Sequence, residues 1–387
     1  MKHSFEGIPL LQIKDLKFYF KFHSFERSKY LDQKFMEYLQ YRPSFEPNPL
    51  EKKAREDYWS LGREKRIVDG EDYTYQQEEV LVKAVDGLNI TVHENESISI
   101  IGETGSGKSS LLFSIMNFHL PHLSHKKGEI NYISRNTKTP VNLLSLSEQQ
   151  MEQYRGIHLG FIPQLPKESL NPWLKIGFQT GEVLFEKLSV RQEKIKERVL
   201  EFLGKVVLPD PKINYNKYVD KLSGGEAQRV CIAMALLADP RIILADEPLS
   251  ALDTIIQANV IHLLLTLKKE LKSSYVFATH NLGVAGQLGD TIAVMYGGEI
   301  VEVRSKEKFF EEPLHPYSKG LLNSAPWYAV KHGLELEEIP GELPKPHEWP
   351  SGCKFHPRCP SAMAMCQNKK PPRMQMNGSL IECFLYS

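Results

Sequence analysis

Between Ile98 and Met116 the sequence reads ISIIGETGSGKSSLLFSIM. Residues 98–101 form a short apolar run, residues 102–109 are rich in glycine, and the apolar residues of 110–116 have helical spacing. A strand, a glycine-rich loop and a helix in this order are typical of a phosphate-binding P-loop. Glycines let the backbone approach a phosphate closely, and converging N–H groups and the helix dipole favour an anion there. We therefore expect this loop to bind phosphate groups.

The polar residues of the loop have separate expected roles. Lys108 would reach the β- and γ-phosphates of a nucleoside triphosphate, and the Ser109 hydroxyl would be a ligand of Mg²⁺. The residues expected to contact the nucleotide here are Gly102, Glu103, Thr104, Gly105, Ser106, Gly107, Lys108, Ser109 and Ser110.

The composition is that of an ordinary globular protein. Among 387 residues, 48 Lys and Arg balance 48 Asp and Glu, so nothing suggests a non-specific nucleic-acid binder. The length suits two or three domains, or one large domain with additions. The N-terminus shows no apolar leader, and no apolar run approaches a membrane span in length. We expect a chain that stays in the cytoplasm and does not cross a membrane.

Two strands are expected at residues 10–20 and 80–92, separated by a segment of different character. Within that segment, a short amphipathic helical pattern runs from Leu31 to Leu39 and is followed by prolines. We interpret residues 23–77 as an insertion in a hairpin, which is either a solvated decoration or an element that docks a partner.

Two polar motifs follow the P-loop helix. Residues 160–163 indicate the end of a strand that delivers Gln164 into a loop, and residues from about 168 to 220 are mostly helical by pattern. A second helix N-terminus suited to an anion, at the start of a helix through Leu237, contains Ser223, Gly224, Gly225 and Glu226.

A fully apolar strand at residues 242–245 ends in two adjacent acids, Asp246 and Glu247. Such a pair at the end of a buried strand is costly unless it faces a cation or polarises water. Asp246 suits the Mg²⁺ shell, and Glu247 suits a base that orients an attacking water molecule. The next apolar strand, at 275–279, ends in His280. A lone histidine is more often structural, but this position favours a contact with a γ-phosphate.

Taken in order, these motifs resemble those of the ATP-binding subunits of ABC transporters. They correspond to the Walker A, Q-loop, signature, Walker B, D-loop and switch histidine motifs, and the resemblance covers residues 10–300. The D-loop is the stretch from Ser250 to Asp253 that follows Walker B directly. Phe20, or as the second choice Tyr19, falls at the position that stacks on adenine in this family.

The resemblance implies an α/β fold of the ABC type. It comprises a RecA-like P-loop NTPase core, an antiparallel β subdomain, a helical signature subdomain at about 165–225 and a cysteine-containing C-terminal extension. We expect the ATP-binding domain to cover residues 1–300, with the insertion at 23–77, and the extension to cover 301–387. Glu226 departs from the family, in which glutamine is commoner at this position of the signature.

The resemblance also implies ATP hydrolysis at an interface between two such subunits. Each ATP would lie between the Walker residues of one subunit and the signature of the other, and Asp253 would communicate across the interface. The residues with implied catalytic roles are Lys108, Gln164, Glu247 and His280. The implied Mg²⁺ ligands are Ser109, Gln164 and Asp246. The residues implied to act on the nucleotide from the partner side are Ser223, Gly224, Gly225, Glu226 and Asp253.

Residues 169–172, 295–302 and 313–322 narrow the resemblance to the oligopeptide/dipeptide and nickel importer branch. This branch implies an ATPase at the cytoplasmic face of the membrane that drives uptake of di- or oligopeptides. Its implied partners are two transmembrane permeases, a second ATP-binding subunit that we expect to be a paralogue, and an extracytoplasmic solute-binding protein, with no nucleic acid. The alternatives are import of nickel or another solute, or a soluble ABC ATPase of DNA repair or translation.

Four of the five cysteines lie in the C-terminal tail, at Cys353, Cys359, Cys366 and Cys383. Their spacing lacks the CxxC pairs of structural zinc sites. Because relatives in this branch can carry a 4Fe–4S cluster on these cysteines, we expect an iron–sulfur centre, with zinc or free thiols as the alternatives. Cys231 lies in an apolar run and is expected in the core.

Overall fold

The computed structural model describes residues 7–23, 67–68, 71–72, 79–118, 124–134, 139–188, 190–250 and 252–387. The chain divides into two units, one formed by residues 1–20 with 82–387 and the other by residues 21–81. In the second unit, β2 (Ile67–Val68) pairs with β3 (Glu71–Asp72). The helix expected between Leu31 and Leu39 and most of the insertion expected at 23–77 lie outside the described residues.

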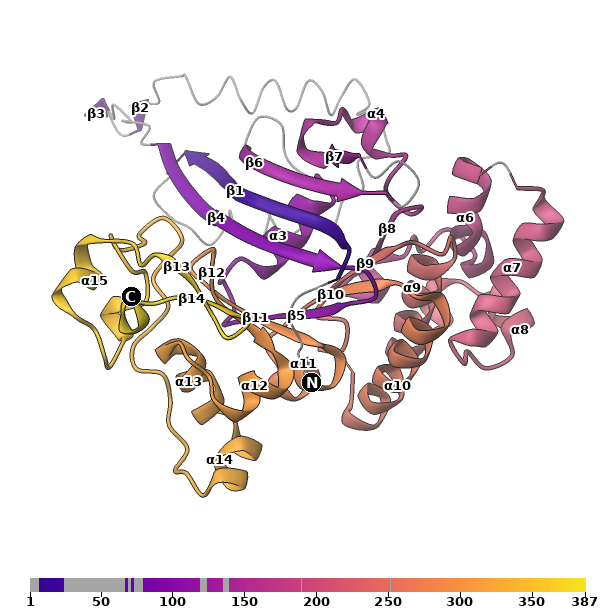
Figure 1. The fold of residues 1–387 in the computed structure, drawn as a ribbon. Coiled ribbons are helices and arrows are strands. Elements are labelled where there is room, and N and C mark those ends of the chain that lie inside the picture. Colours follow the sequence, from indigo (N-terminus) through magenta and orange to yellow (C-terminus); the bar gives the residue numbers. More distant parts are fainter. Residues whose placement is uncertain are drawn as a thin grey trace. The chain divides into compact units, whose positions relative to one another are not determined.

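An eight-stranded sheet forms the centre of the first unit, in the order β13-β14-β12-β11-β5-β10-β9-β8 (Figure 1). The strands from β11 to β8 in this order run parallel, and β12, β14 and β13 continue the sheet antiparallel. Every residue of β5, β9 and β10 is buried, as expected for parallel strands covered on both faces. The strands are β5 (Ser97–Ile101), β8 (Leu159–Ile162), β9 (Ile242–Asp246), β10 (Ser274–Thr279), β11 (Thr291–Tyr296), β12 (Glu299–Ser305), β13 (Arg373–Met376) and β14 (Ser379–Glu382).

A second sheet has four strands in the order β4-β1-β6-β7. β6 pairs antiparallel with both β1 and β7. These strands are β1 (Pro9–His23), β4 (Glu79–His93), β6 (Ser124–Ile133) and β7 (Pro140–Asn142).

The helix α3 (Lys108–Ile115) lies between the two sheets. Leu111, Leu112 and Ile115 belong to one apolar cluster with buried residues of β1, β4 and β6 on one side and of β5, β9 and β10 on the other. Because β5 and α3 are packed in this way, they form a rigid frame at the two ends of the loop 102–107.

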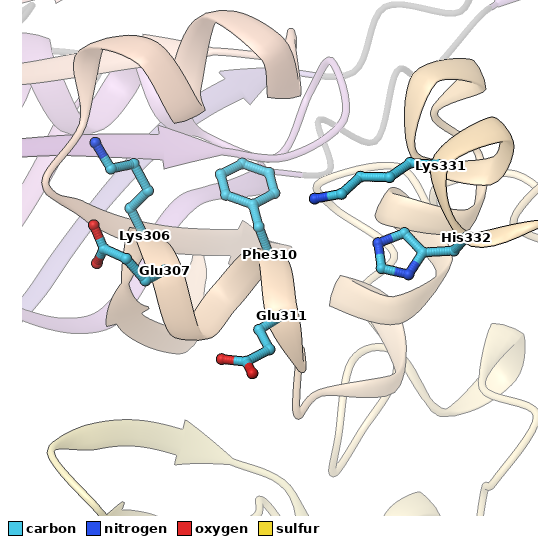
Figure 2. A pocket seen from close by; sticks show the side chains of 6 residues that line it. All are labelled: Lys306, Glu307, Phe310, Glu311, Lys331 and His332. Carbon is cyan, nitrogen blue, oxygen red and sulfur yellow. The ribbon is translucent and has the colours of Figure 1, made fainter.

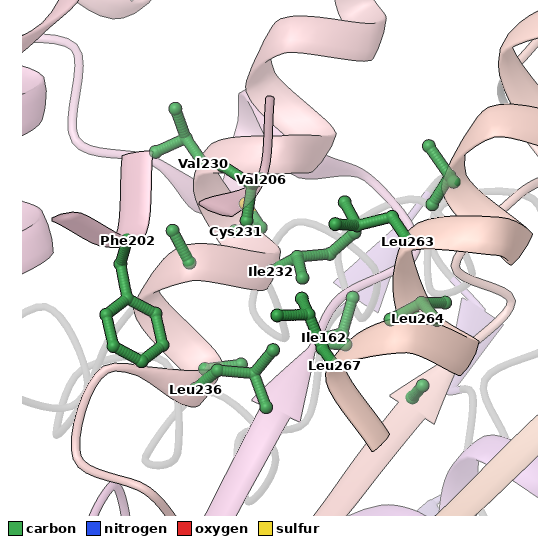
Figure 3. Close-up of a cluster of buried hydrophobic side chains, with 14 of the residues drawn as sticks. Ile162, Phe202, Val206, Val230, Cys231, Ile232, Leu236, Leu263, Leu264 and Leu267 are labelled. Atoms are coloured by element: carbon green, nitrogen blue, oxygen red, sulfur yellow. The ribbon is translucent and has the colours of Figure 1, made fainter. Parts of the chain in front are cut away.

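Helices predominate between β8 and β9 and flank this part of the large sheet. The apolar faces of α6, α7, α9 and α10 share a cluster in which Phe202, Val230, Ile232 and Leu264 are almost inaccessible (Figure 3). Cys231 is buried in the same cluster, as expected. Between β8 and β9 lie α5 (Pro166–Ser169), α6 (Ile176–Leu188), α7 (Gln192–Lys205), α8 (Pro211–Tyr215) and α9 (Gly224–Leu236). α4 (Glu148–Met151) precedes β8, α10 (Thr254–Leu271) follows β9, and α11 (Leu282–Leu288) follows β10.

The C-terminal residues are tied to the large sheet. β14 pairs with β12 through Glu302 opposite Ile381 and Val303 opposite Leu380, and β13 pairs with β14. The remaining helices are α12 (Lys306–Glu311), α13 (Pro316–Asn323), α14 (Pro326–His332) and α15 (Ala364–Asn368). Among the described residues, no helix combines the length and the apolar character needed to cross a membrane.

Candidate nucleotide site

The backbone of the loop 102–107 requires glycine where it passes close to neighbouring strands. Gly107, the N-cap of α3, has φ +103°, and a Cβ on it would lie 2.1 Å from the carbonyl oxygen of Ala84. A Cβ on Gly102 would lie 2.2 Å from the carbonyl oxygen of Met295. No side chain caps the N-terminus of α3. The backbone N–H groups of the first turn are therefore available to an anion.

Lys108 is the first residue of α3 and is only 5% exposed. Its Nζ donates hydrogen bonds to the carbonyl oxygens of Gly102 at 2.8 Å and Glu103 at 3.0 Å. Burial lowers the pKa of Lys108, and the carboxylates of Glu247 and Asp246 oppose that shift. Because an ammonium group has three N–H donors, one remains for a phosphate oxygen. Nearby, the buried Ser106 hydroxyl has no hydrogen-bond partner within the described chain.

Asp246 and Ser109 are brought together although they come from different elements. Asp246 is the last residue of β9, and its Oδ1 accepts a hydrogen bond from the Ser109 Oγ at 3.0 Å. Burial raises the pKa of Asp246 to about 6, against the lowering effect of the Ser109 hydrogen bond. A hydroxyl and a carboxylate are the hard oxygen ligands that Mg²⁺ prefers, so this donor pair fits the expected ion.

Glu247 is held at the centre of a second group of polar side chains. Its Oε1 lies 2.9 Å from the His280 Nδ1, and its Oε2 accepts a hydrogen bond from the Gln164 Nε2 at 3.3 Å. The residue has φ +40°, a left-handed conformation that is strained for a glutamate, and its N–H donates to the Ala278 carbonyl. The structure thus places Gln164 and His280, two residues with expected catalytic roles, each within hydrogen-bonding distance of a third, Glu247.

The expected signature and D-loop residues form hydrogen bonds within the first turns of their own helices. The Ser223 Oγ accepts from the Glu226 N–H, and the Glu226 carboxylate accepts from the Ser223 N–H, which is a capping box at the N-terminus of α9. Asp253 caps α10 by accepting the N–H groups of Ile255 and Ile256. Among the residues that the structure describes, no hydrogen bond joins these residues to the loop 102–107. Ser223 and Gly224 are exposed, so a second molecule could reach this helix start.

The two aromatic candidates for adenine stacking are both engaged within the chain. Phe20 packs against the apolar cluster around α3, and its ring meets Phe18 edge to face at 5.0 Å. The Tyr19 hydroxyl donates a hydrogen bond to Asp86. These contacts do not decide between the two rings, so Phe20 stays our first expectation for the stacking residue and Tyr19 the second.

Two residues near the loop were not expected from the sequence. Arg358 forms two hydrogen bonds with the Glu103 carboxylate, at 2.8 and 3.0 Å, and the Tyr317 hydroxyl accepts the Glu103 N–H at 2.9 Å. Both residues come from the C-terminal region, more than 200 positions from Glu103. Such contacts leave no local pattern, so no sequence signal could have revealed them.

The four tail cysteines lie in one neighbourhood. The Cys353 N–H donates to the Cys366 carbonyl at 2.8 Å, and a Cβ on Gly352 would lie 2.3 Å from that same oxygen. Burial raises the pKa of Cys353 to about 12, and the charges of Cys366, Cys359 and Cys383 contribute. Over the part of the chain that the structure describes, no three His, Cys, Asp or Glu side chains are placed to hold a single metal ion. The residues as placed do not fit a zinc site, and nothing in the structure supports the iron–sulfur centre beyond the proximity of the thiols.

A surface pocket of about 370 Å³ lies between α12 and α14 (Figure 2). Its lining residues are Lys306, Glu307, Phe310, Glu311, Lys331 and His332. None of the residues with an expected role lines this pocket.

Comparison with known protein families gives two matches along the chain. The family described as ABC transporter matches residues 85–250, and the family described as oligopeptide/dipeptide transporter, C-terminal region, matches residues 301–366. The first match includes the loop, Gln164, the signature and the acidic pair, and the second includes three of the tail cysteines.

Individual relatives agree with these matches. The dipeptide transport ATP-binding protein DppD of Caldanaerobacter subterraneus is 38% identical over 81% of this chain and 94% of its own. The oligopeptide transport ATP-binding protein OppD of Bacillus subtilis is 39% identical over 76% of this chain and 81% of its own. Among solved structures, a dimeric ATP-binding cassette in a post-hydrolysis state with ADP and Pi is 30% identical. It covers 60% of this chain and 95% of its own, with a TM-score of 0.52. The chain therefore belongs to the ATP-binding subunits of ABC transporters, in the branch of the oligopeptide/dipeptide transporters.

Proposed function

We propose that this chain is the ATP-hydrolysing subunit of an importer for di- or oligopeptides. The observation that carries the proposal is the position of Glu247, which contacts Gln164 and His280 while its neighbour Asp246 contacts Ser109. Asp246 and Ser109 thus offer oxygen atoms to a metal ion, and Glu247 offers a carboxylate that can orient water, beside a loop suited to phosphate. The names of the relatives support peptides as the cargo.

In this mechanism the loop N–H groups and Lys108 hold the triphosphate, and Ser109, Asp246 and the amide oxygen of Gln164 hold the ion. Bound Mg²⁺ supplies neutralisation of charge on the phosphate oxygens. Glu247 orients the attacking water molecule, and His280, whose Nδ1 faces Glu247, keeps that carboxylate in place and offers its other ring nitrogen to the γ-phosphate. Catalysis is then positioning and electrostatic stabilisation, with no covalent step on the protein.

A second ATP-binding subunit completes the site in this proposal. The exposed start of α9, with Ser223 and Gly224, would meet the nucleotide of the partner, and Asp253 would contact the interface. The dimeric state of the solved relative supports this arrangement. We propose a paralogue as the partner, together with two transmembrane permeases and an extracytoplasmic solute-binding protein. The chain would work at the cytoplasmic face of the membrane as a peripheral subunit. We keep residues 1–300 as the ATP-binding domain, with its helical subdomain at about 165–225, and 301–387 as the extension.

The decisive experiment replaces Glu247 with glutamine in the assembled transporter. Glu247→Gln should keep ATP binding and trap the closed dimer while hydrolysis is lost, because the amide cannot polarise water but preserves the shape of the site. Glu311→Gln, on the surface helix α12, is the matched control and should hydrolyse ATP at the wild-type rate. Hydrolysis by Glu247→Gln at the wild-type rate would contradict the proposed role.

The cargo is tested separately with the reconstituted importer. Binding protein loaded with peptide should stimulate ATP hydrolysis, whereas nickel-loaded binding protein should not. Stimulation by nickel alone would leave the ATPase role intact and would replace the proposed solute.

We also retain the iron–sulfur proposal for the four tail cysteines as a separate hypothesis. What supports it is proximity, since the Cys353 N–H donates a hydrogen bond to the Cys366 carbonyl at 2.8 Å. Protein purified without oxygen should be brown and contain iron, and a colourless, iron-free sample would refute the hypothesis.

A further inference from the structure

The second residue of the phosphate loop is held by side chains of the C-terminal region. The Glu103 carboxylate receives both terminal nitrogens of Arg358, at 2.8 and 3.0 Å, in a paired geometry that only arginine can provide. The Glu103 N–H donates to the Tyr317 hydroxyl at 2.9 Å. Glu103 is therefore restrained both at its side chain and at its backbone.

The groups that restrain Glu103 are themselves fixed. Arg358 is 6% exposed, and its Nε donates to the Pro340 carbonyl at 2.9 Å. The Tyr317 ring is fully buried and packs edge to face against Tyr296 at 4.7 Å. Because neither side chain can move freely, Arg358 and Tyr317 determine the position of Glu103, and not the reverse.

Glu103 in turn sets the direction of the lysine that grips the phosphates. The Lys108 Nζ donates to the carbonyl oxygens of Glu103 and Gly102. Two of its three N–H groups are thus fixed by the loop backbone, and the tetrahedral ammonium geometry then fixes the direction of the third. A shift of the Glu103 carbonyl would turn the ammonium group away from its place beside the nucleotide.

We propose that Arg358 and Tyr317 are positioning residues of the nucleotide site, which hold Glu103 from two sides and so fix the carbonyl that orients Lys108. Through these two residues, the C-terminal region helps to position the phosphate-binding loop of the ATP site. This inference rests on the proposed function, because it takes Lys108 as the phosphate ligand.

The segment 343–349, which precedes Arg358 in the chain, makes further contacts that agree with this role. The side chain of Leu343 lies 3.4 Å from the point where a Cβ of Gly105 would be. The Pro346 carbonyl accepts the Lys83 N–H at 3.2 Å, and the Trp349 Nε1 donates to the Lys83 carbonyl at 3.1 Å. This segment therefore lies along the loop and the adjoining strand β4.

The test measures binding of a non-hydrolysable ATP analogue to the full-length chain and ATP hydrolysis by the assembled transporter. Arg358→Ala should weaken analogue binding and raise KM for ATP by roughly tenfold, since a charge-assisted hydrogen-bond pair is lost. Tyr317→Phe removes one hydroxyl while keeping the buried ring, and should weaken binding by roughly threefold to tenfold. kcat should change by less than about twofold, because Lys108 grips the phosphates before and during the reaction.

The control is Lys370→Ala. Lys370 lies in the same C-terminal region as Arg358, and its side chain pairs with Glu299 and not with Glu103. The variant should leave KM unchanged. A merely structural role for Arg358 would lower the active fraction, and hence kcat, without raising KM. Wild-type affinity and KM in both Arg358→Ala and Tyr317→Phe would overturn the proposal.

A double-mutant cycle tests the link between Arg358 and Glu103 directly. If Arg358→Ala folds poorly, the test rests on Tyr317→Phe, which keeps the buried ring. Glu103→Ala should weaken binding to a similar extent, and combining it with Arg358→Ala should add little, because both changes break one link. Fully additive losses would overturn the proposal. If Lys108→Ala binds the analogue like the wild type, the nucleotide site itself is wrongly assigned. If Lys108→Ala fails to bind while Arg358→Ala and Tyr317→Phe bind normally, only this inference fails.

Discussion

Replacing Asp246 with asparagine should stabilise the nucleotide-free protein, although it should abolish the proposed activity. Burial raises the pKa of this carboxyl from its ordinary value of 3.8 to about 6. The folded state therefore favours the neutral form, and its contribution to stability is fully present below pH 3.8 and is lost as the pH rises through about 6. A difference of about 2 pKa units corresponds to about 3 kcal/mol. Asparagine cannot ionise, and its side-chain oxygen can still accept the Ser109 hydrogen bond.

The assay compares thermal unfolding of the wild type and Asp246→Asn without nucleotide or Mg²⁺. At pH 8 the variant should gain about 3 kcal/mol, or roughly 4 °C in Tm for a chain of this length. At pH 5 the gain should fall to about half, because the wild-type carboxyl is then mostly protonated in the folded state. Asp220→Asn, at an exposed carboxylate, should change Tm at neither pH. Equal melting of Asp246→Asn and wild type at pH 8, or a gain that does not shrink at pH 5, would refute the reasoning.

Two further predictions concern local geometry. Gly107→Ala should destabilise the protein by more than about 2 kcal/mol and weaken ATP-analogue binding, because φ +103° and a contact of 2.1 Å with the Ala84 carbonyl both oppose a Cβ. Both variants are compared with the wild type by urea unfolding. Gly224→Ala, with open space around its Cβ position, should leave the free energy of unfolding unchanged. Equal effects of the two changes would contradict the argument. Glu226→Ala should cost about 1 kcal/mol through loss of the capping box, whereas Glu226→Gln should cost little because glutamine can make the same bond. Equal urea midpoints for the two Glu226 variants would show that the cap contributes nothing.

The parts of the site that the sequence could predict are those set by local chemistry. The end of each buried strand is fixed by where its apolar run stops, so Asp246, Glu247 and His280 could be placed at strand ends from the sequence alone. The departure of the signature at Glu226 is explained in the same local terms. Glutamate serves as well as glutamine at the third position of a capping box, and here it does so.

The C-terminal region could be predicted less well, and for two different reasons. The pairing of β13 with β14 did have a local signal, because Asn377 and Gly378 form a two-residue turn between them with φ +48° and +73°. The docking of β14 on β12, and of Arg358 on Glu103, depends on backbone paths that meet only after folding. No periodicity or spacing in the sequence encodes such a meeting, since the partners are separated by other elements.

The site concentrates three departures from ordinary preference. Lys108 is a buried ammonium with a lowered pKa, Asp246 is a buried carboxyl with a raised pKa, and Glu247 has a left-handed backbone. Each of these lowers the stability of the nucleotide-free protein. The first two costs are electrostatic: an anion would relieve that of Lys108, and a cation would relieve that of Asp246. A triphosphate with Mg²⁺ supplies both charges at once, whereas either alone would relieve one group and leave the other. The stabilisation of the fold by ATP together with Mg²⁺ should therefore exceed the sum of their separate effects, because the two charges are compensated by the same ligand pair.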